Sequence, residues 1–242
     1  MKEQIQKLSK LIIPDKCIDC SAIINESYNI CSECFKKYEF INENICQICG
    51  ILNDVYEQED QYICMNCTLY KPIYSKSRSL FKFDDHSKKL IHKFKYYDHT
   101  NISKFIAKLF ISRFKYLLHE VDIITCVPMH KFKRIYRLYN QSQILAKEIS
   151  NISKQKFPNI EFVPELLFKI KYTKSQTMLT LKERENNIKD SIIKNPKIDI
   201  NGKTILLVDD VITTGNTINT CSKILKNEGA NCVNIFSAAR NY

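Results

Sequence analysis

Eight of the eleven cysteines of the chain fall into four pairs that share one spacing. Each pair reads Cys-x-x-Cys, and the members are Cys17 and Cys20, Cys31 and Cys34, Cys46 and Cys49, Cys64 and Cys67. A Cys-x-x-Cys turn brings two thiolates together, and two such turns supply the four ligands of a tetrahedral Zn²⁺ site. The pattern therefore predicts two zinc sites. The metals are expected to be structural, because four thiolates leave no open coordination position.

The pairing of the four turns is not fixed by their spacing. Successive pairs are separated by 10, 11 and 14 residues, so sequential, nested and interleaved arrangements are all geometrically open. The sequential arrangement is preferred because it closes the shortest loops. Disulfides are the competing interpretation. They are disfavoured because the first ten residues carry no export signal, which predicts a cytoplasmic protein with reduced thiols.

A second group of reactive side chains follows an apolar run in the last quarter of the chain. Ile205 to Val208 predicts a strand buried on both faces, and Asp209 and Asp210 follow at its carboxyl end, where open α/β sheets hold ligands. The next residues are Val211, Ile212, Thr213, Thr214, Gly215, Asn216 and Thr217. Small residues let backbone N–H groups approach a phosphate, and a helix that begins near Thr217 adds its partial positive charge.

This stretch resembles the motif that binds phosphoribosyl diphosphate (PRPP) in type I phosphoribosyltransferases. In that family an apolar strand ends in two acidic residues and a Thr/Gly loop. The resemblance implies that Asp209 and Asp210 bind the 2′- and 3′-hydroxyls of the ribose. It also implies that the loop from Thr213 to Thr217 holds the 5′-phosphate.

Two other segments fit beside this motif. Val121 to Val127 predicts another buried strand. At the position of a diphosphate loop it is followed by Pro128, Met129, His130 and Lys131. A polar segment from Lys169 to Asn187, which contains Arg184, predicts a mobile loop over the site.

Together with residues 90–96, these segments resemble the ComF/GntX family, whose members are linked to DNA uptake in competent bacteria. Members join a zinc-ribbon region to a phosphoribosyltransferase fold and carry V-P-x-H, R-G-F-N-Q and T-x-x-Q-x-x-L-x-x-x-x-R-x-x-N segments. The corresponding stretches here are Val127 to His130, Arg137 to Gln141 and Thr173 to Asn187. Leu138 and Met178 stand where the family has glycine, which opposes close backbone approach at Leu138 and predicts a stiffer loop around Met178.

The resemblance implies an α/β protein of the type I phosphoribosyltransferase fold, a mostly parallel sheet flanked by helices. We expect this domain over residues 76–242, behind a small zinc-ribbon module over residues 1–75. The module has 7 Lys and no Arg against 11 acidic residues, a net charge of −4, whereas the rest of the 242-residue chain carries +15. No apolar run approaches the roughly 20 residues of a membrane-spanning helix.

The sequence is compatible with two functions. In the first, the protein is a phosphoribosyltransferase that uses PRPP with Mg²⁺, in which Lys131 and His130 contact the departing diphosphate and Arg184 closes over it. The acceptor is not visible in the sequence. In the second, the protein binds PRPP or a nucleotide without turnover and acts in DNA uptake, together with other uptake proteins. Single-stranded DNA would then contact basic and aromatic residues of the larger domain, within 81–97 and 131–139.

Overall fold

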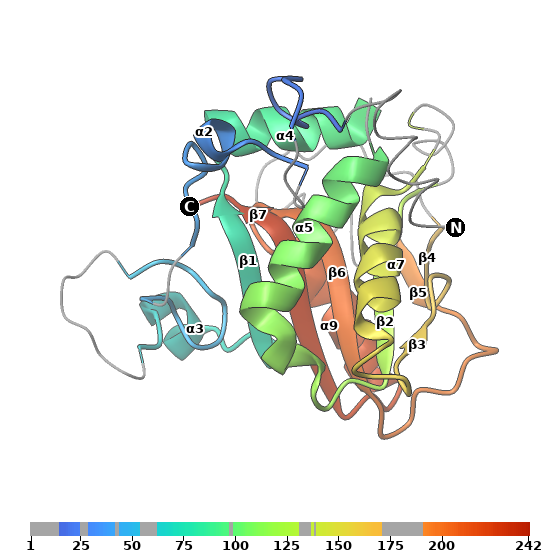
Figure 1. Cartoon of the computed structure of the whole chain (residues 1–242). Helices are drawn as coiled ribbons and strands as arrows, with labels where there is room; N and C mark the ends of the chain where they lie inside the picture. Colours follow the sequence, from blue (N-terminus) through green and yellow to red (C-terminus); the bar gives the residue numbers. More distant parts are fainter. Residues whose placement is uncertain are drawn as a thin grey trace, which may run out of the picture.

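A parallel sheet forms the centre of the molecule in the computed structural model (Figure 1). The structure describes residues 15–24, 29–41, 44–53, 62–96, 99–130, 137, 139–170 and 191–242. The elements discussed below are α2 (Ser32–Phe35), α3 (Met65–Leu69), β1 (Lys76–Lys82), α4 (Asp85–Tyr96), α5 (His99–Phe114), η1 (Lys115–Leu118), β2 (Ile123–Cys126), α7 (Gln141–Ser153), β3 (Glu161–Phe162), β4 (Leu167–Lys169), β5 (Ile192–Lys194), β6 (Thr204–Ile212), α9 (Asn216–Asn227) and β7 (Cys232–Arg240).

The strands of the sheet follow the order β1-β7-β6-β2-β3, and every neighbouring pair is parallel. The first five residues of β6 are buried, which is typical of a strand that is covered on both faces. β4 and β5 form a separate antiparallel pair. The prediction of a mostly parallel sheet flanked by helices is therefore confirmed.

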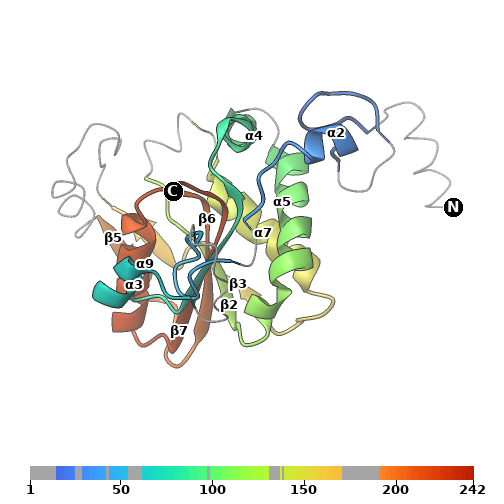
Figure 2. The ribbon, with the colours of Figure 1, turned by 90° about the vertical axis from the view of Figure 1, so that its left-hand side faces the viewer.

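Helices cover both faces of this sheet. Figure 2 shows α5 and α7 on one face and α9 on the other, while α4 lies across the end at which the strands finish. α9 buries Ile218, Cys221 and Leu225, which recur at the spacing of one helical face. On the opposite face, Phe105 and Phe110 of α5 are fully buried. Among the described residues, no helix is long and apolar enough to cross a membrane.

The two cysteine clusters lie against opposite faces of the sheet, next to β1. Cys17 and Cys34 belong to the apolar cluster of α5 and α7, where Tyr38 contacts Phe81. The four cysteines from Cys46 to Cys67 belong to the apolar cluster of α9. β1 lies between the two clusters. Its outer edge bonds to the segment that connects them, through Ile41 N to Leu80 O at 2.9 Å.

Gly50 shows how closely the second cluster approaches this strand. Its φ is +72°, and a Cβ added there would lie 2.4 Å from Ser77 O. The adjacent bond from Ser77 N to Ile48 O is 2.7 Å long. Glycine is required at this position for its conformation and for the close approach of the two backbones.

Candidate functional site

The described cysteines form the two sequential clusters that the loop lengths favoured. One contains Cys17, Cys20, Cys31 and Cys34, the other contains Cys46, Cys49, Cys64 and Cys67, and in each the four sulfurs lie within 4.8 Å of one another. Four thiolates around Zn²⁺ at about 2.3 Å lie about 3.8 Å apart. The sulfurs of Cys20 and Cys31 are 3.8 Å apart and those of Cys49 and Cys64 are 3.7 Å apart. Both clusters therefore have the dimensions of a tetrahedral metal site.

Backbone N–H groups point at one sulfur of each cluster and favour its thiolate form. Asp19 N and Cys31 N each lie 3.4 Å from Cys17 Sγ, and Cys64 N lies 3.4 Å from Cys46 Sγ. Burial acts to raise the pKa of Cys17, but the backbone N–H groups that point at its sulfur lower that pKa to about 7. The same opposing causes bring the pKa of Cys46 to about 7. Thiolates are the form that binds metal.

The apolar run from Ile205 to Val208 predicts a strand that ends before the acid pair. In the structure both acids lie within β6. β6 continues to Ile212 because β7 pairs with it over this length, with Asp209 opposite Ser237 and Ile212 opposite Arg240. On its other edge, the pairing of β6 with β2 reaches only Val208, which lies opposite Cys126. The acid pair therefore begins where β6 loses its partner on the β2 side.

Asp209 is the more enclosed of the two acids. Its Oδ1 accepts hydrogen bonds of 2.9 Å from Ser142 Oγ and from Asp210 N. Burial, followed by the charge of Asp210, raises the pKa of Asp209 to about 8. A carboxyl group with this pKa is largely protonated at neutral pH and can donate a hydrogen bond as well as accept one.

Asp210 has different partners. Its Oδ1 accepts a hydrogen bond of 2.8 Å from Val211 N, and its Oδ2 lies 3.1 Å from Lys95 Nζ. The two neighbouring acids therefore differ in character, because one is held by hydroxyl and amide groups and the other is paired with a cation.

The Thr/Gly loop forms a small hollow beside this pair. The hollow, of about 20 Å³, is lined by Asp209, Val211, Ile212, Thr213, Thr214, Gly215, Asn216, Thr217 and Ile218. Gly215 is the N-cap of α9 with φ +77°, and α9 begins at Asn216, one residue earlier than predicted. This φ is in the left-handed region that favours glycine. The start of a 12-residue helix, where the backbone N–H groups of the first turn have no partner within the helix, faces this hollow.

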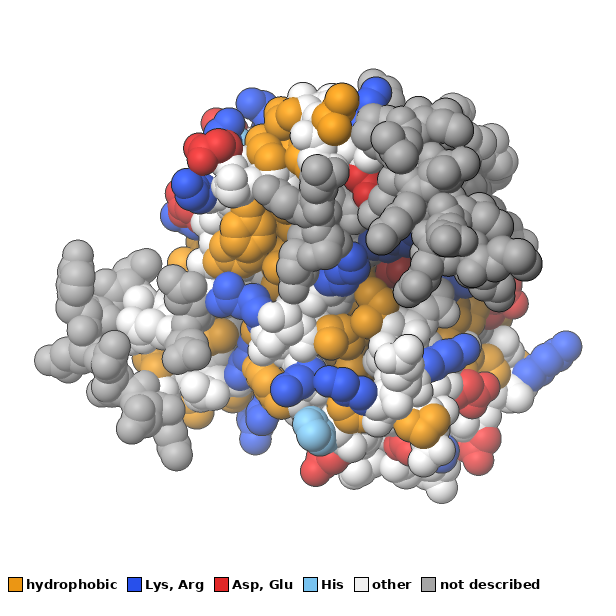
Figure 3. All heavy atoms as spheres, viewed as in Figure 1, with side chains coloured by type: hydrophobic (Ala, Val, Ile, Leu, Met, Phe, Trp, Pro, Cys, Tyr) orange, Lys and Arg blue, Asp and Glu red, His pale blue; other side chains and the backbone are white. Residues whose placement is uncertain are grey.

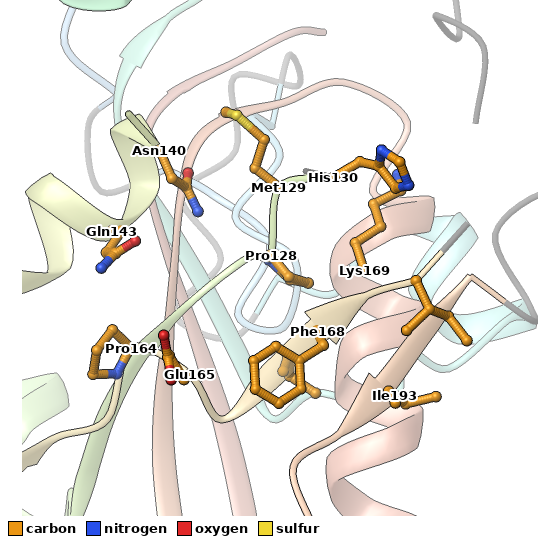
Figure 4. Close-up of a pocket in the computed structure, with 12 residues that line it drawn as sticks. Pro128, Met129, His130, Asn140, Gln143, Pro164, Glu165, Phe168, Lys169 and Ile193 are labelled. Atoms are coloured by element: carbon orange, nitrogen blue, oxygen red, sulfur yellow. The ribbon is translucent and has the colours of Figure 1, made fainter. Parts of the chain in front are cut away.

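A larger cavity of about 490 Å³ lies beside the loop that follows β2 (Figure 4). Pro128, Met129 and His130 form one part of it, and the antiparallel pair β4–β5 forms another with Phe168, Lys169 and Ile193. In Figure 4 the side chain of Lys169 extends toward His130. Lys169 was predicted to begin a mobile loop, but it lies in β4 opposite Ile192.

The residue before α7 holds the start of the loop that follows β2. Asn140 caps the helix by accepting from Ser142 N, and its Nδ2 donates to Val127 O at 3.0 Å. The predicted residues Lys131 and Arg184 lie outside the described residues, as do Leu138 and the segment from Thr173 to Asn187.

Sequence reasoning missed three groups that the fold brings to the site. Ser142 binds Asp209, Lys95 pairs with Asp210, and Phe168 lines the larger cavity. Ser142 could have been suspected, since it is a polar residue on the buried face of an amphipathic helix. No local signal distinguishes Lys95 from the nearby lysines Lys88, Lys89 and Lys93.

Two protein families match this chain. Residues 8–68 match the double zinc ribbon domain, and residues 94–241 match the phosphoribosyl transferase domain. β1 falls between the two matched ranges although it belongs to the sheet. The first match covers both cysteine clusters, and the second covers the acid pair, the Thr/Gly loop and the larger cavity.

Similar proteins align with this chain over nearly their whole length. Competence protein F of Haemophilus influenzae is 27% identical over 232 residues, which cover 93% of this chain and 96% of that protein. The DNA utilization protein YhgH of Escherichia coli K12 is 22% identical over 236 residues, which cover 95% and 99%. Among solved structures, the glutamine PRPP amidotransferase of B. subtilis aligns with a TM-score of 0.41 and 20% identity, over 62% of this chain and 30% of that one.

Proposed function

The chain belongs to the phosphoribosyl transferase domain family, in the ComF/GntX arrangement with a double zinc ribbon ahead of that domain, and from this premise we propose that it binds PRPP at the carboxyl end of its sheet. The ribose hydroxyls would bind to Asp209 and Asp210. The 5′-phosphate would occupy the hollow from Thr213 to Thr217.

One observation carries this proposal. Asp209, the first residue of the acid pair, and the start of α9 line the same hollow, at the place where β6 has no partner on its β2 side. A phosphate group there would meet the positive end of a helix, while hydroxyls attached to the same sugar would meet carboxyl oxygens. No requirement of folding places two acids and a hydroxyl-rich loop together in this way.

The residues also fit a magnesium ion carried by the ligand. Mg²⁺ keeps several waters and is usually held through substrate phosphates with one or two carboxylates. Asp210 already accepts bonds from Lys95 and Val211, so the diphosphate would supply most of the oxygen ligands. The ion would balance the charge of the diphosphate as the C1–O bond of the ribose breaks.

Transfer of the phosphoribosyl group would need an acceptor, and the larger cavity is the place for it. This cavity opens beside Pro128 and His130, which follow β2, the neighbour of β6. Its lining combines apolar side chains such as Phe168 with polar ones such as Gln143 and Glu165. Lys131 and Arg184 would act on the diphosphate.

Calorimetric titration of the full chain with PRPP and Mg²⁺ tests the binding step. We expect saturable binding by the wild type and its loss in the double variant Asp209→Asn, Asp210→Asn, which keeps the shape of both side chains. Unchanged affinity in the folded double variant would refute the ribose assignment. Diphosphate release in the presence of purines, pyrimidines or amines would then identify turnover, after release without an acceptor is subtracted as hydrolysis.

Single-stranded DNA binding is a second candidate, and the face over α5 and α7 favours it. Exposed lysines occur there at Lys104, Lys115, Lys147 and Lys154. Figure 3 shows Lys and Arg side chains spread across this face among apolar ones. Within the predicted segment 81–97, however, Phe81 and Phe94 are fully buried and cannot stack on bases.

Charge-reversal variants test whether DNA binds to this face or to the basic surface in general. Lys104→Glu with Lys147→Glu should weaken binding of a single-stranded oligonucleotide and reduce its salt slope by about 0.7 for each phosphate that is no longer neutralised. The matched control is Lys197→Glu with Lys223→Glu, two exposed lysines outside α5 and α7. Equal losses in the two variants would point to net charge alone and would exclude a defined interface on this face.

A further inference from the structure

Helix α4 places two lysines on either side of its buried face. Phe94 is fully buried, and because successive helical residues are rotated by about 100°, Lys93 and Lys95 lie on opposite flanks of it. Each lysine is partly buried, and each contacts a different part of the molecule. The helix itself lies across the end of the sheet that holds the acid pair (Figure 1).

On one flank, Lys95 holds the second carboxylate of the acid pair. The ion pair with Asp210 leaves only 23% of the lysine and 16% of the aspartate side chain exposed. The remaining carboxylate oxygen is engaged by Val211 N. Asp210 is therefore held in one orientation, with its charge balanced, before a ligand arrives.

The end of α4 is also tied to the start of α7. Gln141 Nε2 donates to Lys95 O at 3.3 Å, and Tyr139 OH donates to Phe94 O at 3.0 Å. The next residue of α7, Ser142, donates to Asp209. Both carboxylates are consequently held from the junction of α4 with α7.

On the other flank, Lys93 binds the turn between the first two cysteines. Its Nζ donates to Ile18 O at 3.2 Å and to Asp19 O at 2.5 Å, and lies 3.5 Å from Asp19 Oδ1. The N–H of the same Ile18–Asp19 peptide donates to Cys17 Sγ at 3.4 Å. One peptide unit thus stands between the Lys93 ammonium and a sulfur of the first cluster, and such outer contacts orient metal ligands.

We propose that α4 couples the first cysteine cluster to the ribose site, with Lys95 as a positioning residue for Asp210 and Lys93 as the anchor of the helix on the Cys17–Cys20 turn. The inference rests on the proposed function, because it needs Asp210 to contact a phosphoribosyl ligand. Coupling between two binding sites is reciprocal, so PRPP changes the zinc affinity of the first cluster by the same factor by which zinc changes the affinity for PRPP. The second cluster docks on β1 and Arg240 and serves as an internal control.

The first measurement is titration of the full-length, zinc-loaded protein with PRPP and Mg²⁺. Lys95→Met should weaken binding about tenfold, since it removes a partly buried hydrogen bond between charged groups. Lys95→Arg keeps the charge and should restore the affinity to within about threefold of the wild type. Lys89→Met removes an exposed lysine of the same helix and should leave the affinity unchanged.

The second measurement is the release of zinc to a chromogenic chelator, which a merely structural role of α4 would not link to PRPP. Coupling of this kind should raise the zinc affinity of the first cluster about fivefold or more when PRPP is bound. Saturating PRPP should then slow the loss of one of the two zinc ions of the wild type. In Lys93→Met and Lys95→Met, PRPP should leave both release rates unchanged, because the connection through α4 is broken.

The outcomes separate this inference from the function on which it rests. A wild-type protein that binds no PRPP would overturn the proposed function. PRPP binding by the wild type, with equal affinity in folded Lys95→Met, would overturn the coupling alone. If Lys95→Met does not fold, Lys93→Met decides, since PRPP that still slows zinc release in that variant contradicts the role of α4.

Discussion

Asp209 and Asp210 are neighbours in sequence, yet the fold gives them separate roles. Ser142 and a backbone amide enclose Asp209, whereas Asp210 faces Lys95. Two adjacent carboxylates repel each other when both are ionised, and enclosing one while pairing the other reduces that repulsion. A ribose with two neighbouring hydroxyls would meet one group that can be protonated and one that is paired with a cation.

The raised pKa of Asp209 predicts a pH dependence of stability. The folded protein holds a proton that the unfolded chain releases near its ordinary pKa, so this group lowers the free energy of unfolding as pH rises from about 4 to about 8. Asp209→Asn should therefore be more stable than the wild type by an amount that grows over this range and levels off above it. The slope should be at most about 1.4 kcal/mol per pH unit.

Urea denaturation of both proteins at several pH values measures this difference. The charged group that acts on Asp209 is Asp210, which is paired with Lys95. Burial, followed by the charge of Asp209, raises the pKa of the thiols of Cys126 and Cys221. Glu120→Gln, at an exposed carboxylate, is the control. A difference that stays constant with pH would show that the pKa of Asp209 is not raised.

At the scale of the elements, the turn at Gly50 and strand β1 approach each other more closely than a side chain permits. Gly50 and Gly202 both have φ near +70°, but a Cβ at Gly202 would meet nothing within 4 Å. Gly202→Ala should lower the free energy of unfolding by about 1 kcal/mol, because alanine is strained at a positive φ. Gly50→Ala should cost roughly 1–3 kcal/mol more, because the cysteine turn must move away from Ser77.

The free energies of unfolding of these two variants, measured side by side, test the close approach. Equal costs would mean that the turn at Gly50 is loosely docked. A larger cost at Gly50 would show that the turn of the second cysteine cluster is tightly docked on β1.

The elements that sequence predicted best were those whose chemistry is local. Loop lengths left three cysteine pairings open but favoured the sequential one that the structure has, and the β6 motif carries its acids and its Thr/Gly loop within a few residues. The contacts of Lys95 and Ser142 depend on how α4 and α7 cross the sheet, which no local pattern records. β6 was predicted too short because its continuation depends on pairing with β7 and not on apolar residues.

At the scale of the whole molecule, the cysteine region is part of the packing around the sheet. Tyr38 contacts Phe81 and Phe105, and Arg240 of β7 donates to Cys49 O at 2.6 Å. Truncation before β1 would remove Tyr38 and expose Phe81 and Phe105 to water. Substitutions in the full chain are therefore better tests of this protein than isolated domains.

Elemental analysis of protein prepared under reducing conditions should give two zinc ions per chain. Chelation should remove hydrogen-exchange protection from the amides of Ile41 and Ser77, which bond across the boundary with β1, because structural zinc supplies folding free energy locally. Amides of β6 that bond to β7 should stay protected. A zinc content near zero, or chelation without effect on these amides, would contradict the role of the clusters.

The position of β7 between β1 and β6 has a consequence for biosynthesis. Ser79 of β1 meets Ser237 of β7, 158 residues later in the chain. While the protein emerges from the ribosome, β1 must wait for almost the whole chain to be made, and unpaired strand edges invite aggregation during such delays. The cysteine clusters are translated before β1 and bond to its outer edge. Zinc captured early would thus let the N-terminal region act as an intramolecular chaperone for the first strand of the sheet.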